Sequence, residues 1–460
     1  MVFDISVNCP LFGKYRFEFL SALCANIIAI AHGAGIAWLS PTLLLLQSED
    51  TPLASGALDV NEASWLGSLL CVGGFAGNLG FGFIANRWGR KRALSLIAFP
   101  QMCFWIIVTF ANDIRFLYAG RVLAGMTGGG CFVTIPLYIS DIASKEIRGS
   151  LGSILMLAVN CGVLVGYSVG SYLPYTVVPK VTIIFPVVYL CLILFFPETP
   201  QFLLLKNNLD GAKASLCFYR NIDPKSSTRE VVQRIEKEID EMRSAMGNTP
   251  TKEASFKDFA SKDALKGMLR GVGLVGVNIF SGIFLIVNYN ATIFKAAGIN
   301  IAPNDATLIV AVSQIAGTYL STLIVERFRR KTLLILTTAT AGLALTIMGT
   351  STYLSQFYDM SGLSWLPVAS LSFMVFAASS GYIPLTFVVM NEVIPRPVRP
   401  LVSSVCNAVL NTFAFASLKL LPMLIEYAGL HVVVWICAAM CFLGVLFNAI
   451  CIPETRGKLI

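Results

Sequence analysis

The sequence predicts an all-α membrane protein with twelve transmembrane helices, arranged as two six-helix halves that a helical linker joins. Three observations predict this fold: an apolar composition, the number of long apolar segments, and short polar motifs that occur once in each half. Hydrophobic residues make up 56% of the 460 residues and charged residues only 13%, whereas soluble domains carry about 25% charged residues. A chain of this composition is expected to lie in a bilayer.

The apolar segments are long enough to cross a membrane as helices. A crossing helix needs about 20 mostly apolar residues, because its backbone polar groups must be satisfied within the segment. The approximate cores of the twelve segments are residues 17–46, 63–85, 93–112, 115–140, 149–173, 180–196, 268–294, 305–325, 332–354, 364–391, 401–425 and 430–452. We therefore predict an N-terminal half at 1–196, a linker at 197–267, and a C-terminal half with a short tail at 268–460.

The linker has its own helical pattern. Charged residues of both signs between Glu230 and Arg243 surround apolar residues such as Ile235 and Ile239. This spacing is typical of an amphipathic helix. We expect short cytosolic helices beneath the bundle, with their charged faces in solvent.

The net charge of +8 reflects the topology of the chain. Most basic residues lie in alternate loops, in the tails or in the linker, and the first of the other loops carries four acidic residues, Glu49, Asp50, Asp59 and Glu62. By the positive-inside rule, both termini and the linker are cytosolic. We predict a multi-pass protein of the plasma membrane, with the lipid bilayer as its surroundings and no nucleic-acid partner.

Three motifs occur at equivalent positions of the two halves. The first motif is Asn86-Arg87-Trp88-Gly89-Arg90-Lys91, repeated as Glu326-Arg327-Phe328-Arg329-Arg330-Lys331. In the second, Asp141 precedes Arg148 by seven residues, as Glu392 precedes Arg399. The third is Pro197-Glu198-Thr199-Pro200, repeated as Pro453-Glu454-Thr455-Arg456. Membrane repeats of this kind place a substrate site between them near the midplane. Rocking of one half against the other then exposes that site to alternate sides.

Charged residues of these motifs suggest a gate at the cytosolic end. They are Arg87, Arg90, Asp141, Arg148, Glu326, Arg330, Glu392 and Arg399. We expect them to pair across the bundle and to hold the cytosolic mouth closed, with Gly89 allowing a tight turn. Exposed ion pairs contribute about 0–1 kcal/mol each, which suits contacts that break in every cycle. The alternative, that the basic residues only anchor helix ends, is less favoured because matching acidic residues are duplicated with them.

Arg121 lies just inside the predicted fourth helix. A buried arginine is costly in a bilayer, so we expect Arg121 to face a polar cavity or a carboxylate and to belong to the gate. The alternative is that its side chain extends to the membrane surface. Gly125 and the run Gly128, Gly129 and Gly130 follow it, and such small residues allow close helix approach.

These motifs resemble those of the sugar porter family of the major facilitator superfamily, over nearly the whole chain. The similar segments also include Gly120-Arg121 and the stretch from Pro136-Leu137-Tyr138 through Arg148-Gly149. Trp38-Leu39-Ser40-Pro41 and Val159-Asn160-Cys161-Gly162 are similar to the insect facilitated trehalose transporter branch. The resemblance implies the major facilitator fold and transport of a sugar by alternating access.

The chain departs from the family at positions that contact the sugar. Where the family has a glutamine pair before Ser-Gly-Ile-Asn, this chain reads Asn278-Ile279-Phe280-Ser281-Gly282-Ile283-Phe284. In the tenth helix, Gly-Pro-Ile-Pro-Trp becomes Gly381-Tyr382-Ile383-Pro384-Leu385. Where the family normally has a glycine in the second basic motif, this chain has Arg329. Where the family usually has a glutamate after the proline-tyrosine motif, this chain has Asp141. The transport machinery is therefore better preserved than the sugar contacts.

Uncharged polar residues remain as candidate solute contacts. On a helical wheel, Asn278, Ser281, Asn288 and Thr292 fall within about 80° of arc. Asn407 and Asn411 share a face of the eleventh helix and match asparagines of the family. Amides donate and accept hydrogen bonds and suit hydroxyl-rich neutral solutes. The alternative role is hydrogen bonding between helices.

We expect facilitated diffusion (uniport) of a neutral sugar such as trehalose or a hexose. Family symporters carry an aspartate in the first helix, and this chain has none there. Two alternatives stay open: a nutrient sensor or receptor that binds without transporting, and a transporter of a non-sugar solute. No enzyme motif is visible, and the twelve cysteines are scattered singly, so we predict no enzyme activity, metal or cofactor. The sequence does not indicate an oligomeric state.

Overall fold

The computed structural model describes residues 15–222, 229–247, 262–325, 327–394 and 399–455, and every regular element in these ranges is helical. The first half contains α2 (Arg16–Ala37), α3 (Leu39–Leu46), α4 (Val60–Trp88), α5 (Arg90–Phe110), α6 (Ile114–Ile142), α7 (Arg148–Tyr172), α8 (Val178–Thr182) and α9 (Ile184–Ile193). The second half contains α14 (Lys262–Phe280), α15 (Ile283–Ala296), α16 (Pro303–Ile324), α17 (Arg330–Leu354), α18 (Leu366–Ser380), α19 (Tyr382–Val393), α20 (Arg399–Ala428) and α21 (Leu430–Cys451), with the 3₁₀ turn Ser361–Leu363 before α18.

The spanning segments agree with the predicted helices except at the sixth. Within the described residues, eleven helices or helix pairs are long and apolar enough to cross a membrane, and Val178–Ile193 is a shorter apolar segment. The sixth helix was predicted at residues 180–196 and is instead two short helices, α8 and α9. Pro186 has no N–H to donate to the carbonyl of Thr182, which is the physical reason for a break here. A continuous helix of this length would cover only about 24 Å.

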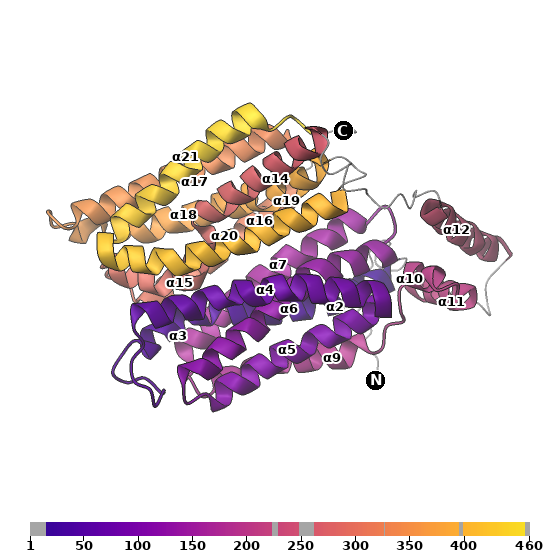
Figure 1. Cartoon of the computed structure of the whole chain (residues 1–460), viewed down its shortest axis with the longest axis horizontal. Coiled ribbons are helices and arrows are strands. Elements are labelled where there is room, and N and C mark those ends of the chain that lie inside the picture. Colours follow the sequence, from indigo (N-terminus) through magenta and orange to yellow (C-terminus); the bar gives the residue numbers. More distant parts are fainter. Residues whose placement is uncertain (1–14, 223–228, 248–261, 326, 395–398, 456–460) are drawn as a thin grey trace.

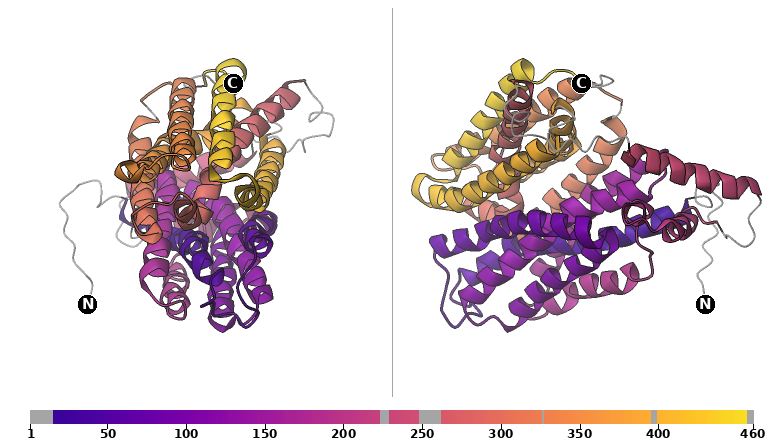
Figure 2. Two further views of the ribbon diagram at one scale, coloured as in Figure 1. Left: turned by 90° about the vertical axis from the view of Figure 1, so that its left-hand side faces the viewer. Right: turned by 45° about the vertical axis from the view of Figure 1, so that its right-hand side comes forward.

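The two halves lie side by side as separate helical bundles. In Figure 1, α2 to α9 form the lower bundle and α14 to α21 the upper one. The helices α10 (Pro200–Leu205), α11 (Leu209–Tyr219) and α12 (Arg229–Gly247) lie at one end of both bundles, and Figure 2 shows them from two further directions. We call this the linker end and the opposite one the far end.

Two of the crossing segments are interrupted at a glycine. The seventh breaks at Gly282, whose φ is +88°, whereas the first keeps helical φ and ψ at Trp38 between α2 and α3. The tenth breaks at Gly381, three residues before Pro384. Because Pro384 cannot donate to the carbonyl of Ser380, a continuous helix is disfavoured there. Interrupted helices in transporters border solute sites.

Glycine contacts set the spacing of helices within the first half. A Cβ atom on Gly125 would lie 2.0 Å from the carbonyl oxygen of Leu70, and one on Gly129 would lie 2.2 Å from that of Gly74. Only glycine fits at such a distance, so α4 and α6 are in backbone contact. The close approach that the sequence predicted for these glycines is confirmed.

The linker helices pack on each other through a small apolar core. Ala212 and Leu216 of α11 are buried against Ile235 and Ile239 of α12. The amphipathic helix predicted around residues 230–243 is therefore confirmed, and its charged side faces solvent as expected.

Candidate solute-binding site and gates

Arg121 connects four helices in the part of the molecule nearer the far end. Its side chain is completely buried. Nε donates to the carbonyl of Leu66 at 3.0 Å, Nη1 to that of Gly35 at 2.8 Å, and Nη2 to Oδ1 of Asn288 at 3.1 Å. Asn288 belongs to α15, so this last bond joins the two halves. All three acceptors are neutral, and the carboxylate proposed as one possible partner is not among them.

Asn278 and Ser281 of the seventh helix bind within the second half, whereas the buried hydroxyl of Thr292 has no hydrogen-bond partner. Nδ2 of Asn278 lies 3.4 Å from Oγ1 of Thr386, and the Ser281 hydroxyl donates to the carbonyl of Asn278 at 2.7 Å. The hydroxyl of Tyr382 donates to Oγ of Ser281 at 2.8 Å. These bonds connect α14 with α19 at the two helix breaks. In this conformation, Asn278 and Ser281 thus have protein partners.

Asn407 and Asn411 lie one turn apart on α20, and both are partly exposed. Nδ2 of Asn411 donates to the carbonyl of Asn407 at 2.9 Å. A Cβ atom on Gly74 would lie 2.9 Å from Oδ1 of Asn411. The amide oxygen of Asn411 therefore faces α4 of the first half, which places Asn411 at the interface between the halves.

Further bonds between the halves connect α15 with the first half. The Tyr289 hydroxyl lies 3.4 Å from the carbonyl of Ala63 in the first half and 3.2 Å from that of Leu418 in the second, and the Tyr167 hydroxyl donates to the carbonyl of Val287 at 2.6 Å. The N–H of Ala291 donates to Oγ of Ser40 at 2.9 Å. Sequence reasoning missed these contacts, because a tyrosine or serine in an apolar segment gives no sign of its partner.

Two sets of contacts at the far end also join the halves. Nζ of Lys419 donates to Oδ1 of Asn61 at 2.6 Å and to Oγ of Ser64 at 2.8 Å, and lies 4.2 Å from the centre of the Trp65 ring. The Tyr172 hydroxyl donates to Oδ1 of Asp305 at 2.8 Å, between α7 and α16. Hydrogen bonds between the halves thus extend from Asn160 in the middle of α7, which binds Thr318 and Gln314 of α16, to the far end.

The motifs of the first half meet at the linker end. Nε of Arg90 lies 2.9 Å from Oδ2 of Asp141, and both side chains are buried. Thr199 donates to the same carboxylate at 3.1 Å. The backbone N–H of Lys91 donates to Oε1 of Glu198 at 3.0 Å. We call Arg90, Lys91, Asp141, Glu198 and Thr199 the first-half cluster.

The repeated motifs form an equivalent second-half cluster of Arg330, Lys331, Glu392 and Glu454. Arg330 pairs with Glu392, as Arg90 pairs with Asp141. The N–H of Arg330 donates to Oε1 of Glu454 at 3.1 Å. Lys331 Nζ donates to a backbone carbonyl at 2.6 Å, as Lys91 Nζ does at 2.9 Å. The sequence repeat is therefore also a repeat of side-chain contacts.

Gly89 is required by the first-half cluster. Its φ is +113°, and a Cβ atom there would lie 2.2 Å from Oε2 of Glu198. At the corresponding position of the second half, Arg329 has a φ of −66°. The second turn needs no glycine, which explains how arginine can stand at that position.

Among the gate residues that the structure describes, the ion pairs of the two clusters and the hydrogen bond of Arg148 do not form one network across the two halves. Between described side chains, the ion pairs at the linker end stay within one half, stay within the linker, or join the first half to the linker. Arg148 donates only a 3.4 Å bond to the carbonyl of Ala143 among described contacts, and Arg87 is exposed. Glu326 and the side chain of Arg399 lie outside the described residues.

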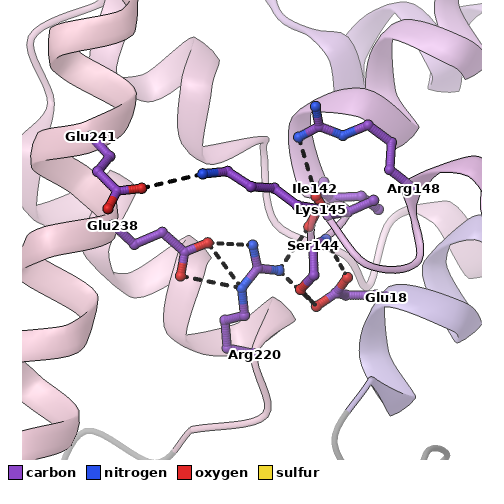
Figure 3. A network of polar contacts seen from close by, with 9 residues as sticks. Glu18, Ile142, Ser144, Lys145, Arg148, Arg220, Glu238 and Glu241 are labelled. Carbon is purple, nitrogen blue, oxygen red and sulfur yellow. Dashed lines mark hydrogen bonds and ion pairs between the residues drawn. The ribbon is translucent and has the colours of Figure 1, made fainter. Parts of the chain in front are cut away.

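A buried ion-pair network attaches the linker to the first half, as Figure 3 shows. Nη1 of Arg220 lies 2.7 Å from Oε1 of Glu18 and Nη2 lies 2.5 Å from Oε1 of Glu238. Glu18 is completely buried and also accepts hydrogen bonds from the N–H and the hydroxyl of Ser144 at 2.7 and 2.8 Å. Burial alone lowers the pKa of Arg220, but its bonds to Glu238 and the charges of Glu18 and Glu238 raise the pKa above its ordinary value. No sequence motif pointed to Glu18 or Arg220.

Known proteins with similar sequence and structure are transporters. The family model described as sugar (and other) transporter matches residues 22–460. The facilitated trehalose transporter Tret1 of Polypedilum vanderplanki is 28% identical over 446 residues, which cover 96% of this chain and 86% of that protein. Tret1 of Apis mellifera ligustica is 26% identical, covering 97% and 87%. The E. coli xylose transporter XylE, in a partially occluded inward open conformation, has a TM-score of 0.79 at 20% identity and covers 97% of this chain and 100% of that one.

These matches confirm the fold and the resemblance that the motifs predicted. The matched region includes both clusters at the linker end and the polar interface around Arg121 and Asn288. This chain is a multi-pass membrane protein that belongs to the sugar (and other) transporter family.

Proposed function

We propose that the chain is a facilitative transporter of a neutral sugar, trehalose or a hexose, and that it works by alternating access. The observation that carries this proposal is the set of amide and hydroxyl groups of Asn288, Asn411 and Tyr289 at the interface between the halves, where the Arg121 guanidinium binds neutral acceptors. Amide and hydroxyl groups match the donors and acceptors of a sugar. The names of the relatives add support for a trehalose-like solute.

The contacts between the halves support one state of an alternating-access cycle. Their hydrogen bonds lie in the middle and at the far end, while each cluster at the linker end stays within its own half. In this state the solute path opens toward the linker end. In the opposite state, the first-half and second-half clusters meet, Arg148 and Arg399 join them, and the linker end closes.

Passive transport follows from the environment of Arg121. Its guanidinium binds two backbone carbonyls and one amide oxygen, so no titrating carboxylate is paired with it. A proton that binds and leaves a carboxylate is the usual way to couple solute movement to a pH gradient. We also propose that the linker end, which is rich in basic residues, faces the cytosol and that the protein lies in the plasma membrane.

Uptake into proteoliposomes tests this function. Purified full-length chain is reconstituted and given labelled trehalose, glucose, a polyol and an apolar solute, with Asn278→Ala measured beside the wild type. We expect saturable uptake of trehalose or glucose that stops at equal concentrations on both sides. Uphill accumulation driven by a pH gradient would contradict passive transport. Uptake of apolar solutes alone would contradict the sugar assignment, and no uptake of any solute would favour a sensor.

A further inference from the structure

The hydrogen bonds between the seventh helix and the first half are concentrated in one short stretch of α15, at residues 287–291. The helix is kinked at Tyr289, whose φ is −122° and ψ is 21°. The carbonyl of Val287 and the N–H of Ala291 lie on either side of this kink, one turn apart. Tyr167 and Ser40 of the first half bind these two groups.

Each neighbour of Asn290 in this stretch has a partner in the first half. Asn288 accepts from Arg121, Tyr289 reaches the carbonyl of Ala63, and Ala291 donates to Ser40. Asn290 itself is completely buried, yet neither Oδ1 nor Nδ2 has a hydrogen-bond partner. The Tyr167 hydroxyl donates its hydrogen to Val287, and its oxygen lies close enough to the Asn290 amide to interact with it, although no hydrogen bond of normal geometry joins the two side chains.

An unpartnered buried amide needs an explanation. More than nine in ten buried polar groups form hydrogen bonds, because leaving one unpaired costs the full desolvation of that group. A leucine or an alanine would fill the same place without this cost. Because Asn290 lies at the interface between the halves, its amide can gain a partner once the halves separate.

We propose that Asn290 is a solute-contacting residue, whose amide binds a hydroxyl group of the transported sugar when the far end opens. The inference rests on the proposed sugar transport. A hydroxyl both donates and accepts, and so does an amide. When the halves separate at the far end, the bonds of Tyr289 and Ala291 to the first half break and the Asn290 amide becomes accessible. Unlike Asn288, whose Oδ1 must leave Arg121, Asn290 gives up no protein bond to bind solute.

The sequence Asn290-Ala291-Thr292 fits the acceptor pattern for N-glycosylation, and the burial of Asn290 decides whether a glycan can be attached there. Its side chain is completely buried between the halves, so a glycan cannot be accommodated there in this conformation. The asparagine is assigned to solute binding.

Asn448 provides a matched control. Its amide is also buried, at 1% exposure, and both Oδ1 and Nδ2 lack partners. It lies on α21, whose contacts are with helices of the second half. Asn290→Ala and Asn448→Ala therefore remove the same chemical group at sites inside and outside the interface between the halves.

The experiment measures the concentration of labelled trehalose and of glucose that gives half-maximal uptake into proteoliposomes. We expect Asn290→Ala to raise it about threefold to tenfold, as loss of one hydrogen bond predicts, while Asn448→Ala stays near the wild type. A series of deoxyglucoses should show one hydroxyl whose removal weakens uptake in the wild type but not in Asn290→Ala. Because the amide has no protein partner here, the melting temperature of Asn290→Ala should not fall.

Three results would overturn the inference in different ways. An unchanged half-maximal concentration in Asn290→Ala, with active wild type, would exclude the solute contact alone. An equal change in Asn448→Ala, or a lowered melting temperature of Asn290→Ala, would show a structural role. No saturable uptake by the wild type would overturn the proposed function, and this inference with it.

Discussion

The guanidinium of Arg121 in the first half donates a 3.1 Å hydrogen bond to the amide oxygen of Asn288 in the second half. Both side chains are completely buried. Hydrogen bonds to charged groups contribute about 1.5–3 kcal/mol, more than neutral ones. This contact is therefore a strong polar connection between the halves, and it must break when they separate at this level.

Replacement of Asn288 tests this connection. We expect Asn288→Ala to lower the free energy of unfolding by about 1–3 kcal/mol, because it leaves a buried N–H of Arg121 unpaired. Thermal unfolding of the purified chain in detergent measures the change. Asn278→Ala is the control, since its bond to Thr386 is long, at 3.4 Å. An equal loss of stability in both variants would contradict the special role of the Arg121 contact.

The ion pair of the first-half cluster should be essential for stability. Asp141→Ala leaves the buried Arg90 without its counter-charge, and breaking such a pair costs about 3–5 kcal/mol. The exposed pair of Lys145 with Glu241, at 3.4 Å, is the comparison. We expect Lys145→Ala to leave the melting temperature almost unchanged and Asp141→Ala to lower it strongly. Similar melting temperatures for the two variants would rule out the buried pair as a major source of stability.

Gly89 should tolerate no side chain. Gly89→Ala combines an unfavourable φ of +113° with a Cβ atom 2.2 Å from Glu198, and a strained residue costs on the order of 1–3 kcal/mol. We expect a lower melting temperature and displacement of Glu198 from the N–H of Lys91. Gly80→Ala is the control, because nothing lies within 4 Å of its Cβ position, and it should be neutral or slightly stabilising. A stable Gly89→Ala protein would show that this turn can relax.

Arg220 should hold the linker on the first half. Arg220→Ala removes the bonds to Glu18 and Glu238, and it leaves Glu18 buried with only Ser144 as a partner. We expect faster hydrogen exchange in α12, because its polar connection to α2 is lost. Lys213→Ala removes a more exposed pair with Glu236 and should change exchange little. Unchanged exchange in Arg220→Ala would mean that the apolar core of α11 and α12 suffices to hold α12 in place.

The sequence predicted the elements of the fold because their signals are local. Eleven of the spans follow from length and hydropathy, and the sixth is present as the shorter apolar segment Val178–Ile193, which is divided into α8 and α9 near Pro186. The repeat of Arg90 and Asp141 by Arg330 and Glu392 was also visible in the chain. The sequence did not show that each arginine pairs with the carboxylate of its own half. The same residues could also have paired between the halves.

The candidate site was only partly predictable for the same reason. Asn288 was predicted from helical spacing, and Arg121 from the cost of a charge in the membrane. The hydrogen bond between Arg121 and Asn288 depends on how α6 and α15 pack together. The spacing of residues within one helix does not predict that packing. Glu18 and Arg220 gave no signal, because they are 202 positions apart along the chain and neither belongs to a repeated motif.

By itself, the sequence determined that this chain spans a membrane in two repeated halves with basic clusters at one end. Apolar runs, charge placement and repeated motifs depend on the residues alone. Only the tertiary structure decided that Arg121 binds Asn288 and that each Arg–carboxylate pair lies within its own half. It also decided that Asn290 is buried without a partner. Hydrogen bonds require specific distances between atoms far apart in the chain, and those distances exist only once the helices have packed.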